Sequence, residues 1–158
     1  MKLLKLLAFA LVFFLNNLQL SAQHLEYCSW HTIETKNQPV QRHEAAFIEA
    51  KGKFYLCGGR GIRPVSIFNP KNNTWTKGTK PPIELHHFEG ISYKNNILMA
   101  GAFTGRYPHE TPVPNAYVYN TKKDKWTQEF EIPKDRRRGA AMAKIHKDKL
   151  YLICGIID

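Results

Sequence analysis

The sequence lacks most of the features that mark membrane, zinc and hydrolase proteins. Its longest unbroken apolar run, Leu6 to Leu15, is ten residues long, whereas a membrane-spanning helix needs about 20. The three cysteines (Cys28, Cys57 and Cys154) form no CxxC pair and no His/Cys cluster with zinc spacing, so neither a metal site nor a cofactor is predicted. A GxSxG motif is also missing, and no segment is long and periodic enough to predict a helix.

The N-terminal segment is arranged like a secretory signal peptide. Lys2 and Lys5 precede the apolar run and form a short positive region. After the run, a more polar stretch ends at Leu20-Ser21-Ala22. We therefore expect cleavage after Ala22 and a secreted or periplasmic chain of residues 23–158, with a retained N-terminal anchor as the alternative. No membrane span is expected in that mature chain.

The charge of the chain is strongly basic, with 23 Lys and Arg against 13 Asp and Glu, a formal net charge of +10. Such a surface favours acidic partners of many kinds. A signal peptide would send the protein away from nucleic acid, so nucleic acid is not predicted as a partner.

A repeat is the main signal. Tryptophans stand at 30, 75 and 126, and the last two end similar segments, Ile67 to Trp75 and Val118 to Trp126, each an apolar strand, a polar turn and a strand carrying Trp. An apolar strand followed by small residues recurs in step at 53–59, 96–102 and 149–155. A further strand lies about ten residues upstream of each. Each unit is thus predicted to be four short strands.

The positions of several residues follow from this register. Trp75 and Trp126 are expected to be largely buried between units. Cys57 and Cys154 lie in apolar strands and are expected to be buried thiols. The small residues after each apolar strand are expected where chains converge and unusual φ values are needed.

These features resemble the Kelch repeat, whose pattern is an apolar strand ending in Gly-Gly and then an aromatic residue before a Trp. Gly58-Gly59, Phe68 and Trp75 fit it; the second unit departs with Gly101-Ala102 but keeps Tyr119 and Trp126, and the third has Cys154-Gly155. The resemblance implies an all-β, Kelch-type β-propeller, similar to galactose-oxidase-like and sialic-acid-epimerase-like propellers. Unrelated hairpins in a sandwich are the alternative.

The predicted propeller is incomplete, with about two and a half blades of four antiparallel strands. We expect an outer strand of a closing blade at about 26–34, full blades at about 42–79 and 85–129, and a partial blade at about 138–158. Closure needs at least four blades. The chain is therefore interpreted as the N-terminal portion of a longer protein whose remaining blades lie beyond Asp158; ring completion by oligomerising, or a degenerate fragment, are the alternatives.

Candidate binding residues come from two sets of loops that the resemblance places on one face around the axis. Cationic and ring-bearing side chains gather in both sets, and we expect them to bind a ligand or, alternatively, to serve only the repeat. The ten residues are Arg42, His43, Arg60, Arg63, His86, His87, Arg106, Tyr107, His109 and Arg138.

The function expected from this face is recognition of an acidic glycan or a protein. Guanidinium groups suit carboxylates, and neutral imidazoles suit sugar hydroxyls. The alternative is a sugar-active enzyme of the sialic acid epimerase kind, with catalytic groups partly on missing blades. No catalytic residue is identified, and the fragment itself is more readily interpreted as a binding module than as an enzyme.

Overall fold

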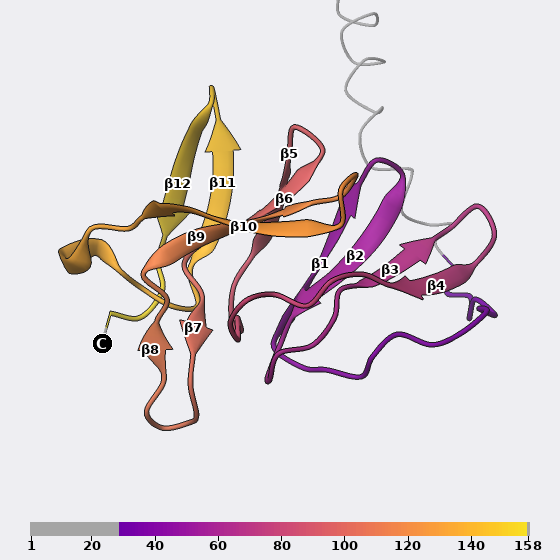
Figure 1. Ribbon diagram of the computed structural model, residues 1–158, viewed down its shortest axis with the longest axis horizontal. Coiled ribbons are helices and arrows are strands. Elements are labelled where there is room, and N and C mark those ends of the chain that lie inside the picture. The colour runs from indigo at the N-terminus through magenta and orange to yellow at the C-terminus, as the bar shows by residue number, and fades with distance from the viewer. Residues whose placement is uncertain (1–28, 158) are drawn as a thin grey trace, which may run out of the picture. The chain divides into compact units, whose positions relative to one another are not determined.

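The computed structural model describes residues 29–157 and divides the chain into two units, Met1–Ile33 and Glu34–Asp158. All described strands lie in the second unit (Figure 1). Among the described residues the regular elements are twelve strands and one short 3₁₀ turn, η2 (Lys134–Arg136). No helix in this part of the chain has the length and apolar character to cross a membrane.

The first four strands form an antiparallel sheet in chain order, β1-β2-β3-β4. Their bounds are Ala45–Ala50, Lys53–Gly58, Ser66–Asn69 and Thr74–Lys77. In β1 the side chains alternate, because Ala46, Ile48 and Ala50 are buried whereas Phe47 and Glu49 are exposed. This sheet lies within the segment predicted as the first full blade.

A second four-stranded sheet has the order β10-β9-β6-β5. Its strands are β5 (Gly90–Tyr93), β6 (Asn96–Met99), β9 (Asn115–Asn120) and β10 (Lys125–Glu131). Between β6 and β9 the chain forms a separate hairpin of β7 (Phe103–Thr104) and β8 (Thr111–Pro112), within one of the loops predicted to carry binding residues. Strands β11 (Met142–His146) and β12 (Lys149–Ile153) form a final two-stranded sheet. The all-β prediction of four-stranded antiparallel units, ending in a partial one, is confirmed.

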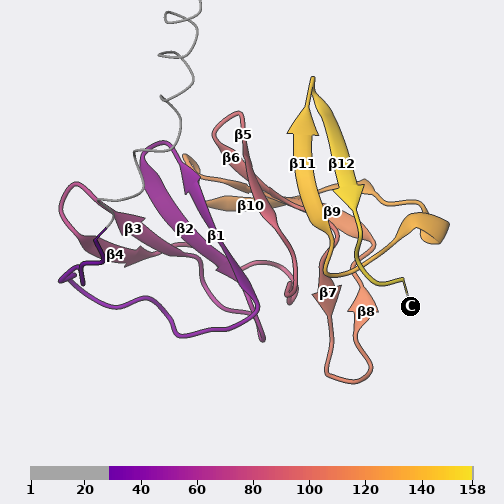
Figure 2. The ribbon, with the colours of Figure 1, turned by 180° about the vertical axis from the view of Figure 1, so that it is seen from behind.

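Apolar side chains fill the space between successive sheets, as expected for propeller blades. The larger core lies between the first two sheets and includes Ile48, Tyr55, Cys57, Met99 and Tyr119. A smaller core joins the second sheet to β11–β12. Strand β5 contacts both β1 and β11, so the first strand of each sheet lies beside its counterpart, as both views show (Figure 2).

Backbone hydrogen bonds link the segments that lead into these first strands. The amide of His87 donates to the Glu44 carbonyl at 3.1 Å, and the amide of Ala140 donates to the His87 carbonyl at 2.9 Å. All three residues have positive φ, at 58°, 49° and 53° in chain order. This repeated link brings the side chains of Glu44 and His87 to neighbouring positions.

The small residues at or just after the ends of β2, β6 and β12 adopt the unusual backbone that the sequence predicted. Gly58 and Gly101 have φ of 69°, and Cys154 at the equivalent position has φ of 59°. A Cβ at Gly58 would lie 2.5 Å from the Leu85 carbonyl oxygen. Glycine is therefore required there by both conformation and space.

The two tryptophans are partly buried, and neither ring is exposed. Trp126 packs against the core between the first two sheets, and its indole N–H donates to the Thr79 carbonyl at 3.1 Å. Trp75 instead lies beside Phe68 and Phe47 on the opposite face of the first sheet. Phe47 is 56% exposed there, so this face has less cover than the equivalent face of the second sheet.

The strand expected at about 26–34 is not formed in residues 29–34. A strand needs partners for its backbone groups, and its predicted partners lay beyond Asp158. The first backbone pairing observed is that of Lys36, which bonds to Asn73 and Trp75 at the edge of β4. Residues 26–28, and the predicted signal peptide at 1–22, lie outside the described residues.

The two described cysteines differ in environment. Cys57 is buried, and this burial raises the pKa of its thiol to about 12. Cys154 is exposed, contrary to the prediction, because the far side of the β11–β12 hairpin is not packed against another sheet of the described chain. Cys28 lies outside the described residues.

Candidate functional site

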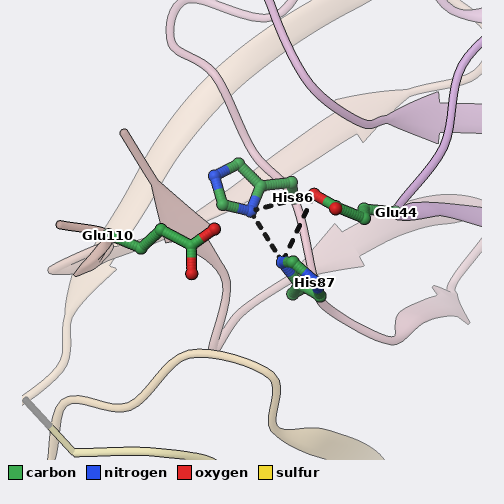
Figure 3. A group of neighbouring side chains, drawn as sticks. All are labelled: Glu44, His86, His87 and Glu110. Carbon is green, nitrogen blue, oxygen red and sulfur yellow. Dashed lines mark hydrogen bonds and ion pairs between the residues drawn. The ribbon is translucent and has the colours of Figure 1, made fainter. Parts of the chain in front are cut away.

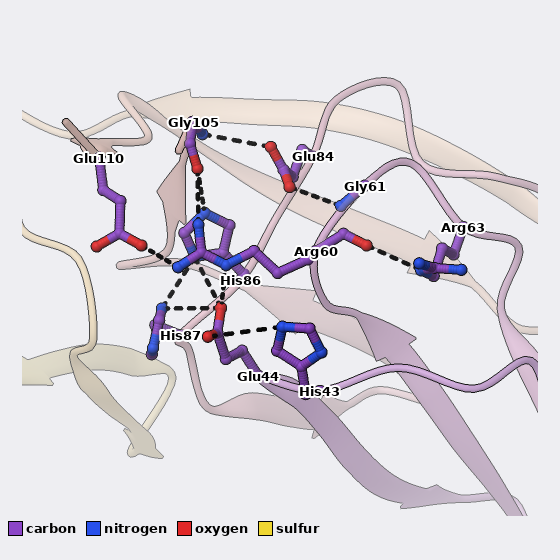
Figure 4. Close-up of polar contacts among 10 residues, drawn as sticks. All are labelled: His43, Glu44, Arg60, Gly61, Arg63, Glu84, His86, His87, Gly105 and Glu110. Carbon is purple, nitrogen blue, oxygen red and sulfur yellow. Dashed lines mark hydrogen bonds and ion pairs between the residues drawn. The ribbon is translucent and has the colours of Figure 1, made fainter. Parts of the chain in front are cut away.

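A cluster of five polar side chains gathers where the loops of the first two sheets meet (Figure 4), and Figure 3 shows four of them. Four segments supply it: the one leading into β1, the loop after β2, the one leading into β5, and the β7–β8 hairpin. We call these residues the polar cluster: Glu44, Arg60, His86, His87 and Glu110.

His86 is the buried member of the polar cluster, with none of its surface exposed. Its backbone pairs with Phe103 in both directions, at 2.9 and 2.8 Å, which fixes the segment against β7. The ring Nε2 lies 3.1 Å from the Gly105 carbonyl oxygen, so this nitrogen carries the proton and donates. Nδ1 therefore faces Nδ1 of His87 at 2.9 Å as an acceptor.

Arg60 connects the first sheet to the hairpin of the second. Its guanidinium forms ion pairs with Glu44 and Glu110 and donates to the Gly105 carbonyl at 2.9 Å. Glu84 supports the same region by accepting from the amides of Gly61 and Gly105. These contacts fix the hairpin base against the loop after β2.

Glu44 remains ionised in this setting. Partial burial alone would raise the pKa of its carboxyl group, but the hydrogen bond from Arg60 and the nearby charges of His87, Arg60 and His43 hold that pKa below its ordinary value. One carboxylate oxygen lies 3.5 Å from His87 Nδ1 and 3.7 Å from His86 Nδ1. His43 Nε2 is 3.8 Å from the other oxygen.

Two of the predicted binding arginines are engaged by the backbone of the repeat itself. Arg42 donates to the carbonyls of Val40, Gly58 and Pro64 and to the Ser66 hydroxyl. Arg138, at the equivalent position, donates to the Cys154 carbonyl at 2.9 Å and to the Arg136 carbonyl at 3.3 Å. Both side chains are thus placed to hold loops.

The remaining predicted residues divide between the polar cluster and an exposed tip. Arg63 donates to the Arg60 carbonyl at 2.8 Å and lies at the edge of the polar cluster. His43 is 72% exposed beside Glu44. Arg106, Tyr107 and His109 are exposed between β7 and β8, and within residues 29–157 none of their side chains has a hydrogen bond or ion pair. We call residues 106–109 the hairpin tip.

Sequence reasoning missed the three glutamates of this region. Glu44 directly follows His43 and lies one repeat before His87, so the repeat offset could have pointed to the pair. Glu84 and Glu110 gave no such signal, because the contacts of Glu110 depend on the hairpin that replaces the predicted loop.

The chemistry of the polar cluster is that of hydrogen bonding, proton exchange and cation binding. Ligand atoms of Glu44, His86, His87 and Glu110 all lie within 4.8 Å of one another. Two imidazoles and carboxylates form a donor set that suits divalent metal ions.

Known proteins share the architecture. No family model matches the chain. Kelch repeat and BTB domain-containing protein 8 of Danio rerio is 26% identical over 113 residues, covering 66% of this chain and 17% of that protein. The solved structure of YjhT matches with a TM-score of 0.62 at 15% identity, covering 75% of this chain and 35% of that one. The chain thus spans only part of the length of either protein.

Proposed function

We propose that this Kelch-repeat chain, which forms part of a β-propeller, is a recognition module that binds an acidic sugar at its hairpin tip. Propellers of this type serve as binding modules or enzymes, and the fold does not choose between them. The observation that carries the proposal is the hairpin tip, where Arg106, Tyr107 and His109 project with free polar groups while Arg42, Arg60 and Arg138 are engaged by the protein.

The three side chains of the hairpin tip suit different parts of a sugar acid. The Arg106 guanidinium can meet a carboxylate with two parallel hydrogen bonds. The Tyr107 ring, 81% exposed, offers an apolar surface for a pyranose face. His109 can share hydrogen bonds with hydroxyl groups. The hairpin base is held by Arg60 and Glu84, which reduces the ordering cost of binding.

The ionised state of the Glu44 carboxyl group argues against a role for Glu44 as a catalytic acid. An acid–base catalyst works best with a pKa near the operating pH. The Glu44 carboxyl, paired with Arg60, has its pKa shifted away from that range, so it is a poor proton donor at neutral pH. This is evidence against Glu44 as a general acid; a sugar-active enzyme with catalytic groups on further blades is the alternative proposal.

The test is a binding comparison on the full-length protein. Isothermal titration with uronate-containing and sialylated oligosaccharides, and with neutral oligosaccharides of the same size, is expected to show binding of the acidic set only. Arg106→Met should weaken that binding about tenfold or more if the contact is desolvated, since a hydrogen bond to a charged group contributes about 1.5–3 kcal/mol.

Arg136→Met is the matched control, because Arg136 is an exposed arginine of η2 outside the proposed site. Its affinity should equal that of the unchanged protein. Equal affinity for acidic and neutral sugars, or unchanged affinity in Arg106→Met, would contradict the acidic-sugar proposal. Turnover of a bound sugar would favour the enzyme instead.

We also propose that the protein is exported and works with further blades. The N-terminal layout supports export. Exposed apolar residues on the outer sheets, such as Phe47 and Ile153, support additional blades, because such faces are covered inside a propeller. N-terminal sequencing and mass measurement of the native protein should give Gln23 as the first residue and a mass larger than residues 23–158 account for. A native N-terminus at Met1 would contradict export. A mass equal to that of residues 23–158 would contradict the proposal of further blades.

A further inference from the structure

We propose that His86, His87 and Glu44 form a binding site for a divalent transition-metal ion, best suited to Zn²⁺. This site lies at the base of the β7–β8 hairpin and does not depend on the sugar proposal. His86 already has the arrangement of a metal ligand. Its Nε2–H donates to the Gly105 carbonyl at 3.1 Å, which fixes the tautomer and leaves Nδ1 unprotonated, facing His87 Nδ1. Metal-binding histidines commonly donate their second ring nitrogen in this way.

The distances among the three ligand atoms fit a metal ion. The two Nδ1 atoms are 2.9 Å apart, and the Glu44 oxygen lies 3.5 Å from His87 Nδ1 and 3.7 Å from His86 Nδ1. A point about 2.0 Å from all three atoms exists at the centre of this triangle. Zinc binds imidazole nitrogen and carboxylate oxygen at about 2.0–2.2 Å. The side chains therefore need little movement to coordinate an ion, and the proton on His87 Nδ1 moves to Nε2 or to solvent when the ion binds.

Local charge also favours a cation. Two carboxylates, Glu44 and Glu110, line the site and pair with one guanidinium, that of Arg60. Arg63 is further out and contacts Arg60 only through its main-chain oxygen. A divalent ion would offset the excess negative charge, and Glu110, whose carboxylate lies within the same 4.8 Å group, can supply a fourth ligand.

Arg60 has two opposed effects on such an ion. It holds Glu44 ionised, which is the form that binds a metal. It also contacts the same Glu44 oxygen that faces the two imidazoles, so it competes with the ion for that oxygen. Because the ordinary pKa of a glutamate lies far below neutral pH, Glu44 stays ionised without Arg60, so the competition decides and removal of the Arg60 charge should strengthen metal binding.

The experiment titrates the untagged full-length protein, freed of metal by chelation, with ZnCl₂ in a calorimeter and with CoCl₂ in a spectrophotometer. We expect one ion per chain with micromolar or tighter affinity, and visible absorption bands of four-coordinate cobalt. His87→Gln and Glu44→Gln should each weaken zinc binding at least tenfold and abolish the cobalt bands. Arg60→Met should bind zinc several-fold more tightly.

His43→Gln is the matched control, because His43 is the neighbouring imidazole but faces the other oxygen of Glu44. It should bind zinc like the unchanged protein. His87, which is 37% exposed, carries the test in preference to the buried His86, and thermal melting of the metal-free variants verifies folding. If His87→Gln fails to fold, Arg60→Met still tests the site.

Three outcomes would overturn the site. The first is the absence of heat and of cobalt bands at millimolar metal. The second is retained affinity in a folded His87→Gln variant, and the third is zinc binding in Arg60→Met that is no tighter than in the unchanged protein. A histidine pair that only shares a proton would give the first of these results.

Discussion

Replacement of Tyr119 by alanine is expected to lower the free energy of unfolding by about 3–5 kcal/mol. Tyr119 has no exposed surface and lies in the core between the first two sheets. Its ring centroid is 6.0 Å from that of Tyr55 and 5.2 Å from that of Trp126. Alanine would leave a cavity that rigid sheets fill poorly. Urea denaturation of the full-length protein, followed by tryptophan fluorescence, measures the loss.

Tyr119→Phe separates the ring from its hydroxyl group. The hydroxyl donates to the Asp124 carboxylate at 2.6 Å, so its removal should cost about 1 kcal/mol after allowance for solvent near Asp124. Tyr107→Ala is the exposed control and should change stability by less than about 0.5 kcal/mol. If Tyr119→Ala costs no more than Tyr107→Ala, the placement of Tyr119 in the core is wrong.

The same pair gives a pH dependence with a defined sign. Burial alone would raise the pKa of Asp124, but hydrogen bonds from Tyr119 and Thr79 hold that pKa below its ordinary value. The stabilisation is therefore present above the carboxyl pKa of the unfolded chain, and it is lost as pH falls through the lower pKa of the folded state. Tyr119→Phe should lose less stability on acidification than the unchanged protein.

The strands were predictable because their signals are local and repeat. Each apolar strand is bounded by turn residues, and three copies in register fix the spacing of the sheets. The small residues at Gly58 and Gly101 likewise implied unusual backbone, which their positive φ confirms. Burial was less predictable, since it depends on which sheet lies opposite: Trp75 and Trp126 share a repeat position but face different neighbours.

The candidate site was predictable only in part. The repeat register placed His86 and His87 at the same loop face as Arg60, and the structure brings these three into one cluster. The partners of Arg60, Glu44 and Glu110, come from segments far apart in the sequence, and no periodicity relates Glu110 to the others. Side-chain pairing of this kind follows from hairpin geometry, which the sequence pattern does not specify.

The role of Arg42 shows the same limit. The sequence shows that Arg42 and Arg138 occupy equivalent repeat positions. That equivalence is compatible with ligand binding by both residues or with a role of both in stabilising the repeat. The structure adds the acceptors: Arg42 donates to the Gly58 carbonyl and Arg138 to the Cys154 carbonyl, and these acceptors are themselves equivalent positions. The same donor-to-acceptor spacing of 16 residues therefore occurs in two repeats of the chain, which favours a structural role for both arginines.

Arg42→Met is accordingly expected to lower the free energy of unfolding by about 3 kcal/mol. The half-buried guanidinium donates at 2.6 Å to Pro64, at 2.9 Å to Gly58 and at 3.1 Å to Val40, and methionine would leave these carbonyls without their donor. Arg42→Lys should recover little of the loss, since an ammonium group cannot reproduce the planar fork. Denaturation by urea is again the measurement.

Arg138→Met provides the internal comparison, because Arg138 makes two main-chain contacts where Arg42 makes three and also reaches the Ser66 hydroxyl. We expect a loss of about 1 kcal/mol there, a third of that at Arg42. In conditions where both variants are folded, their affinity for acidic sugars should match that of the unchanged protein. A folded Arg42→Met variant with full stability and lost sugar affinity would contradict this structural role. It would show instead that the Arg42 guanidinium contacts the ligand.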